Sequence, residues 1–183
     1  MSVGPGGPVA APALPFSDDL AAVLSNPEYG IATEVRAYPT SDRSLIYGDL
    51  DWEVEVTHDG SVFTVHSFQR GSEEDPVAVC RDGEDVVRII LLLQAGSLLR
   101  GTGSPDPWAG AQQPPDTAPG VEMHRRDDGW IVQIAPDRSA RFTDHRSETL
   151  AYEFAEVCTV PVPVLIAALT SPDAPAALAS ARD

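Results

Sequence analysis

The side chains suited to proton transfer or metal binding are four histidines: His58, His66, His124 and His145. No two of them stand four residues apart, which is the spacing of the H-E-x-x-H zinc motif. The run around His145 also carries Asp144 and Glu148, and polar residues of this kind are typical of the start of a helix. We interpret that run as a helix start and predict no metal site.

One histidine gains a carboxylate partner from a predicted hairpin. Acidic and apolar residues alternate over residues 51–56, and His58-Asp59-Gly60-Ser61 supplies a tight turn. If Asp59 and Gly60 form a two-residue loop, Glu53 lies opposite His66, and a carboxylate favours the protonated form of a neighbouring imidazole. An acid–base couple and an ordinary cross-strand polar pair both explain this arrangement. We adopt the second interpretation.

The remaining reactive groups match no catalytic pattern. Cys80 and Cys158 each follow a valine and form no C-x-x-C motif, which predicts buried, reduced thiols and leaves a disulfide between them open. The run Asp127-Asp128-Gly129 lacks the twelve-residue ligand spacing of a calcium loop and predicts a hairpin turn. The sequence has no G-x-S-x-G motif for a nucleophilic serine. We therefore predict a protein that is not an enzyme and has no cofactor.

The elements that position these residues are mostly hairpins. Predicted helices cover residues 18–24, 83–100 and 161–169, with a further helix that begins at Asp144 or Ser147 and ends at Cys158. Predicted strands cover residues 31–38, 45–47, the two arms of the 51–70 hairpin, 77–80, the two arms of a hairpin around Asp128-Gly129, and 140–143. The order is α-βββ(β)-α-loop-βββ-αα. It predicts an α+β fold, with a hairpin-built antiparallel sheet and helices packed on one side.

Segments rich in glycine, proline and alanine divide the chain. We expect a flexible tail over residues 1–16, a single domain over residues 17–172 and a second flexible tail over residues 173–183. Within the domain, residues 101–120 form a proline- and glycine-rich loop. A loop of that length in a small domain is usually functional or disordered.

The charge of the chain excludes several classes of partner. Its 12 basic residues are all arginine, and with 28 acidic residues the formal net charge is −16. Such a chain repels the phosphates of nucleic acids and an anionic membrane surface, and without lysine it cannot build a P-loop. It has no apolar run of the ~18 residues that a membrane span needs, and residues 1–15 lack the pattern of a secretion signal. The exclusive use of arginine also suggests a GC-rich, actinobacterial coding sequence.

The acidic residues concentrate on the predicted hairpin. Asp51, Glu53 and Glu55 project from one face of its first strand, opposite the face of the apolar residues. A solvated surface that keeps the protein soluble explains them, and so does a surface that steers a basic partner. In the long loop, Trp108 follows Asp106 and Pro107, and we expect it to be an exposed aromatic anchor beside that charge. These five residues, Asp51, Glu53, Glu55, Asp106 and Trp108, are the candidate partner-binding residues.

A series of short segments also carries a family resemblance: Ser67-Phe68-Gln69-Arg70, Gly83-Glu84-Asp85-Val86-Val87, Leu99-Arg100, Asp128-Gly129-Trp130 and residues 161–170. Over residues 17–172 the arrangement resembles the small acidic immunity proteins of bacterial polymorphic-toxin systems. The likeness is to those that protect against NAD-degrading toxins of the tuberculosis-necrotizing-toxin type. It implies a protein that binds a cognate toxin and occludes its active site, through residues 101–120 or the acidic hairpin.

The same order of elements also resembles the secretion-chaperone fold, α-βββ-α-ββ-α, whose members are small, acidic and cytoplasmic. That resemblance implies the alternative function of an adaptor for an effector or exported protein. An immunity protein forms a stoichiometric complex with a folded toxin domain, whereas a chaperone is a dimer that binds an unfolded segment. We expect the first function, with a protein partner and a cytoplasmic location.

Overall fold

One antiparallel sheet joins all the strands in the part of the chain that the structure describes. This computed structural model describes residues 18–32, 34–37, 43–48, 52–69, 72–73, 76–109, 117–143 and 147–182. The strands are β1 (Glu34–Ala37), β2 (Arg43–Gly48), β3 (Trp52–His58), β4 (Phe63–Gln69), β5 (Ser72–Glu73), β6 (Ala78–Cys80), β7 (Glu122–Arg126), β8 (Gly129–Ala135) and β9 (Arg138–Phe142). They are ordered β1-β2-β3-β4-β6-β9-β8-β7, and β5 pairs with β4.

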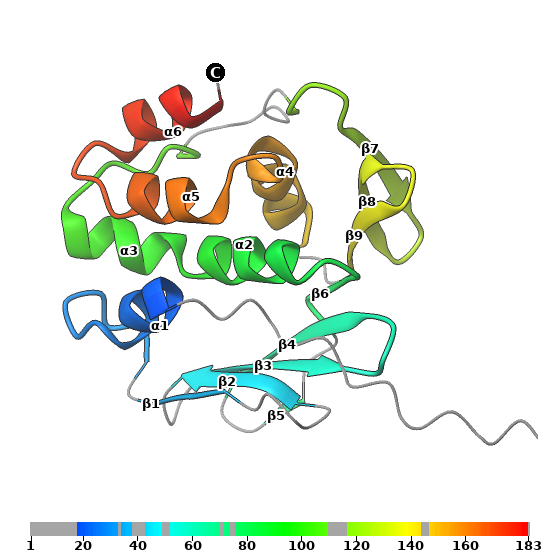
Figure 1. Ribbon diagram of the computed structural model, residues 1–183, viewed down its shortest axis with the longest axis horizontal. Helices are drawn as coiled ribbons and strands as arrows, with labels where there is room; N and C mark the ends of the chain where they lie inside the picture. Colours follow the sequence, from blue (N-terminus) through cyan, green and yellow to red (C-terminus); the bar gives the residue numbers. More distant parts are fainter. Residues whose placement is uncertain are drawn as a thin grey trace, which may run out of the picture.

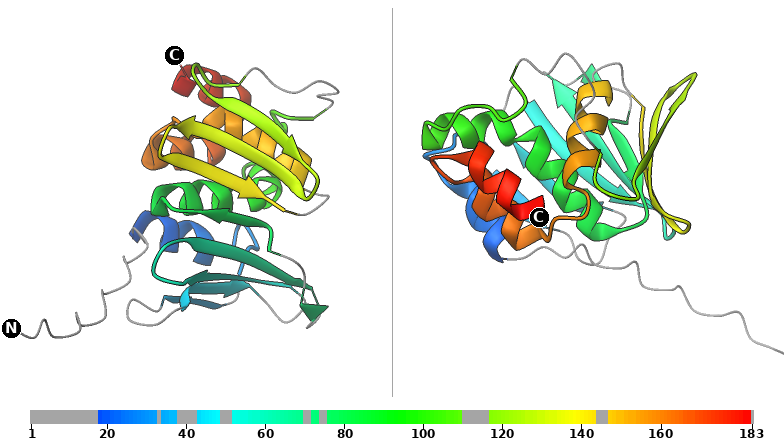
Figure 2. Two further views of the ribbon diagram at one scale, coloured as in Figure 1. Left: turned by 90° about the vertical axis from the view of Figure 1, so that its right-hand side faces the viewer. Right: turned by 90° about the horizontal axis from the view of Figure 1, so that it is seen from above.

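The described helices lie on one side of this curved sheet (Figures 1 and 2). They are α1 (Asp18–Ser25), α2 (Gly83–Leu93), α3 (Ala95–Thr102), α4 (Ser147–Val157), α5 (Val162–Leu169) and α6 (Ala174–Arg182). Helix α2 is central and contacts β4, β6, α4 and α5, whereas α4 covers β8 and β9 and α6 packs on α5. The predicted α+β class, with an antiparallel sheet and helices on one side, is confirmed.

None of the described helices is long and apolar enough to cross a membrane alone. Residues Glu148–Val157 and Val162–Leu169 reach the required length and hydropathy only as a pair. A bend of 116° separates the two helices of that pair.

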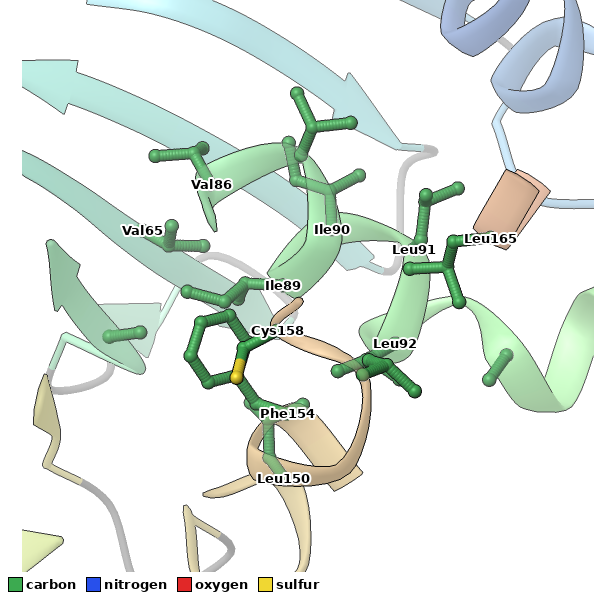
Figure 3. Close-up of a cluster of buried hydrophobic side chains, with 14 of the residues drawn as sticks. Val65, Val86, Ile89, Ile90, Leu91, Leu92, Leu150, Phe154, Cys158 and Leu165 are labelled. Atoms are coloured by element: carbon green, nitrogen blue, oxygen red, sulfur yellow. The ribbon is translucent and has the colours of Figure 1, made fainter. Parts of the chain in front are cut away.

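Alternation along the central strands fills the core. Val54, Val56 and Val65 are fully buried on the helical side of the sheet. Figure 3 shows Val65 of β4 and Phe154 of α4 beside the apolar side chain of Ile89 of α2. Fully burying an aliphatic or aromatic side chain of this size contributes about 1.5–3 kcal/mol. The period of two therefore fixes which face of the sheet the helices cover.

The first hairpin keeps its predicted faces but not its predicted pairs. His58 pairs with Phe63, so residues 59–62 form the loop instead of Asp59 and Gly60 alone. The Asp59 carboxylate accepts hydrogen bonds from the backbone N–H groups of Val62 (3.0 Å) and Ser61 (2.8 Å), and these bonds lower the pKa of Asp59 to about 2. The pairing shifts by two residues, and a shift of two leaves every side chain on its predicted face.

Residues 83–100, predicted as one helix, form α2 and most of α3 with a break at Gln94. At the break, Nε2 of Gln94 donates a hydrogen bond to the buried hydroxyl of Tyr47 at 3.1 Å. Burial raises the pKa of Tyr47, so its hydroxyl keeps its proton. Gly103 ends α3 in the left-handed conformation, with φ at 69°, as expected for a glycine after a helix.

The C-terminal residues differ from the flexible tail predicted over residues 173–183. Residues 174–182 form helix α6, and its Leu178 is fully buried against the core. The Asp173 carboxylate accepts a hydrogen bond from the Ala176 N–H at 3.3 Å, and the Ala174 N–H donates to the Ser104 hydroxyl at 2.8 Å. These contacts order an alanine-rich segment whose composition alone suggested a tail. The predicted N-terminal tail, residues 1–16, lies outside the described residues.

Candidate functional site

The candidate site is the face of the first hairpin that points away from the helices. Glu53 and Glu55 of β3 alternate with the buried Val54 and Val56, so their side chains leave the sheet on the side opposite the helices. Glu53 is exposed and Glu55 is half-buried. Asp51, the third predicted acidic residue of this face, lies outside the described residues.

Two aromatic rings of β4 share this face with the acidic residues. The strand register pairs Glu55 with His66 and Glu53 with Phe68, whereas the predicted register paired Glu53 with His66. The rings of His66 and Phe68 stack with centroids 6.1 Å apart and an interplanar angle of 24°. We call Glu53, Glu55, His66 and Phe68 the open hairpin face. It combines negative charge with aromatic surface, a combination suited to holding cationic side chains.

Trp108 is not the exposed anchor that the sequence predicts. Its ring is half-buried against the core, and its indole Nε1–H donates a 2.6 Å hydrogen bond to the Glu156 carboxylate of α4. Asp106 is exposed, and its carboxylate accepts the backbone N–H of Trp108 at 2.9 Å. Both residues lie on the helical side of the sheet, so the structure does not bring them together with Glu53 and Glu55.

The described parts of the long loop are held against the helices. Besides the contacts of Ser104 and Trp108, the Ala118 N–H donates to the Ala155 carbonyl oxygen at 3.1 Å, and Ala118 and Val121 are buried. Residues 110–116 of the predicted loop lie outside the described residues. A loop with these contacts contributes to the fold, so removing it would cost stability as well as any binding that it supports.

A buried ion network, which sequence reasoning missed, ties the helices to the sheet. The carboxylate of Asp85 is fully buried and accepts two hydrogen bonds from the Arg138 guanidinium, at 2.9 and 2.5 Å, and one from Arg88 at 3.2 Å. Arg88 also donates to the Val160 carbonyl oxygen at 3.0 Å, and Arg138 donates to that of Cys158 at 3.0 Å. The network therefore joins the start of α2, the start of β9 and the link between α4 and α5.

One sequence signal marks this network. Arg88 stands in an otherwise apolar stretch of α2, with Glu84 four residues and Asp85 three residues before it. A charged side chain in a buried helix needs a partner, and those two spacings place acids on its own face. Asp85 stands in the first turn of α2, where an acidic residue favours the helix dipole, and its full burial makes it the central acceptor of the network.

Several arginines are paired with carboxylates within the chain. Besides Arg88 and Arg138, Arg141 pairs with Asp128 and Arg182 pairs with Glu156. At least four of the 12 arginines thus have carboxylate partners within the chain, and two of these four serve the buried network. The open hairpin face keeps its carboxylates on the far side of the sheet from that network.

The two cysteines are buried free thiols, as predicted. Burial raises the pKa of the Cys158 thiol to about 11, and burial together with the nearby Asp85 raises that of Cys80. Thiols that stay protonated are poor nucleophiles. Among the described residues, no three His, Cys, Asp or Glu side chains are grouped so that they could hold a metal ion.

Taken together, these features define an α+β protein whose antiparallel sheet carries helices on one side and an acidic, aromatic face on the other. Its fold is similar to that of the solved structure titled "Rv3902c from M. tuberculosis", with a TM-score of 0.61 and 13% sequence identity. The match covers 90% of this chain and 94% of that one. At this identity the likeness concerns the fold alone. No protein-family model and no curated protein matches the chain.

Proposed function

We propose that this chain is an immunity protein that binds a cognate toxin domain in the cytoplasm of an actinobacterium and occludes the toxin's active site. The open hairpin face is the observation that carries the proposal. It combines the exposed carboxylate of Glu53 and the half-buried side chain of Glu55 with two stacked aromatic rings, on the side of the sheet where no described helix packs (Figure 1). A basic, folded partner surface is the complement of such a face.

The charge of the whole chain supports a basic protein partner. The net charge of −16 creates a field that attracts a cationic surface and raises the rate of encounter. The resemblance to immunity proteins against NAD-degrading toxins points to a toxin domain as that partner. Inhibition then needs no chemistry from this chain, because covering the active site is sufficient.

An inhibition assay tests the proposal. The toxin domain encoded beside this chain would be purified, and its hydrolysis of NAD measured while the chain is added. We expect hydrolysis to fall to zero at one molecule of chain per toxin, with a 1:1 complex on size-exclusion chromatography. Unchanged hydrolysis at a tenfold excess of the chain would refute the proposal, and a dimer that binds only an unfolded segment would favour the chaperone alternative.

Charge changes on the open hairpin face should slow association. The variant Glu53→Arg with Glu55→Gln changes the net charge by three units at this face. We expect the association rate with the toxin domain to fall by roughly 10-fold at low ionic strength and its salt dependence to flatten, because electrostatic steering acts mainly on that rate. Stopped-flow or surface-plasmon-resonance kinetics at several salt concentrations measure both effects.

A matched control separates the face from the overall charge. Glu28→Arg with Asp137→Asn makes the same change of three units at two exposed positions outside this face. We expect it to reduce the association rate far less than the variant at Glu53 and Glu55, provided that both variants melt near the wild-type temperature. Equal rates for the two variants would mean that the open hairpin face is not the contact.

A further inference from the structure

A group of acidic side chains surrounds the point where Trp108 meets helix α4. Glu156 accepts the Trp108 indole N–H at 2.6 Å and also pairs with Arg182 of α6. Glu153, one turn earlier on α4, is half-buried and lies within electrostatic reach of Asp106 and Glu156. We call Asp106, Glu153 and Glu156 the carboxylate cluster.

Among the described residues, the cation paired with this cluster is Arg182, which forms an ion pair with Glu156. After burial, the charges that raise the pKa of Glu153 are those of Asp106, from the segment before Trp108, and of Glu156, from its own helix. Helix α5, which packs beside α6, contains no charged residue. With all three carboxylates ionised, the cluster carries three negative charges against one positive charge.

Asp106 transmits this repulsion to Trp108. Its carboxylate accepts the backbone N–H of Trp108 at 2.9 Å, and its carbonyl oxygen accepts that of Ala109 at 3.2 Å. The two residues therefore belong to one hydrogen-bonded turn. A force that moves the Asp106 carboxylate away from α4 also moves the Trp108 ring away from Glu156.

We propose that the protonation of Glu153 controls the docking of residues 104–109 on helix α4. With Glu153 protonated, the Trp108–Glu156 hydrogen bond holds the segment against α4 and α6. With Glu153 ionised, repulsion of Asp106 and Glu156 weakens that bond and loosens the segment. The device responds near neutral pH, since burial, then Asp106 and then Glu156 raise the pKa of Glu153 to about 7.

The indole N–H resonance of Trp108 in ¹H–¹⁵N spectra reports the docking directly. The chain has three tryptophans, and a Trp108→Phe variant identifies the resonance. As the pH rises from 5.5 to 8.5, we expect the chemical shift of this resonance to change with a midpoint near pH 7. The change should be away from the shift that is typical of a strong hydrogen bond to a carboxylate. The movement should vanish in Glu153→Gln, and its midpoint should fall to lower pH in Asp106→Asn.

Two comparisons make the test decisive. Glu148→Gln removes an exposed carboxylate at the start of the same helix and should leave the midpoint near pH 7. A resonance that stays fixed across this pH range in the wild type would overturn the proposal. So would an unchanged titration in Glu153→Gln, because another group would then be its source.

Stability gives a second, independent measurement. A carboxyl group whose pKa is raised on folding stabilises the folded state fully below its unfolded value of 4.5, and that contribution is lost as the pH rises through about 7. Glu153→Gln lacks this loss. The free energy of unfolding of the variant, relative to that of the wild type, should therefore increase as the pH rises from 5 to 8. A difference that stays constant over this range would overturn the proposal.

Discussion

Replacement of Asp85 by alanine should lower the free energy of unfolding by about 3–5 kcal/mol, the cost of removing one partner from a buried ion pair. Asp85 is fully buried and accepts hydrogen bonds from both Arg88 and Arg138. Arg88 is only 3% exposed. Without Asp85, its guanidinium remains in the core and lacks its buried carboxylate partner. Urea unfolding followed by circular dichroism measures the change.

Glu84→Ala is the matched control, since Glu84 pairs with the same arginine at 2.9 Å but its side chain is 58% exposed. An exposed pair on a helix contributes about 0.3–0.5 kcal/mol, so this variant should unfold almost like the wild type. Asp85→Asn keeps the shape of the side chain and should fall between the two. Similar losses for Asp85→Ala and Glu84→Ala would contradict the structural role given to the buried network.

The two hairpins show what a period of two allows a sequence to predict. The sequence predicts that His58 pairs with Ser61 and that Asp127 pairs with Trp130. In the structure both pairings are displaced by two residues, because His58 pairs with Phe63 and Arg126 pairs with Gly129. The faces survive this displacement because alternate residues share a face. The pairs do not survive, because hydrophobic alternation does not encode where a turn begins or how long it is: hydrogen bonds to Asp59 accompany a longer first turn, and the second turn keeps two residues but begins one residue earlier.

The features that sequence reasoning missed depend on contacts between distant residues. Arg138 reaches Asp85 across 53 positions, and Trp108 reaches Glu156 across 48. A tryptophan flanked by aspartate and proline in a long loop has the local pattern of an exposed anchor, and only the acceptor on α4 makes it a structural residue. The open hairpin face was predictable because every residue that defines it belongs to one hairpin.

The largest effect expected from a glycine concerns Gly129, at the first position of β8. Its φ is +137°, a conformation that side chains rarely adopt, and an added Cβ would collide with the carbonyl oxygen of Phe142 and lie 2.9 Å from its carbon. These are backbone atoms of β9, which pairs with β8 at Trp130 and Phe142. They can yield only if the pairing of β8 with β9 is disturbed.

Gly129→Ala should therefore lower the free energy of unfolding by about 3 kcal/mol or more, from backbone strain together with steric overlap. The displacement reaches the core, because Phe142 is fully buried and its ring contacts Phe154 of α4 with centroids 5.3 Å apart. Urea unfolding gives the loss, and the fluorescence of Trp130, whose ring contacts Tyr152, should change before global unfolding.

Gly60→Ala isolates the contribution of the close approach. Gly60 also has a positive φ, +97°, but no atom lies within 4 Å of an added Cβ. The alanine there meets conformational strain alone, about 1–2 kcal/mol. Both variants place an alanine at a positive φ, and they differ most in the space around the new methyl group, so their difference reports how firmly β9 holds its place beside β8. Equal losses would show that β9 moves aside freely, and the second half of the sheet would then be less rigid than the buried Phe142 and Phe154 require.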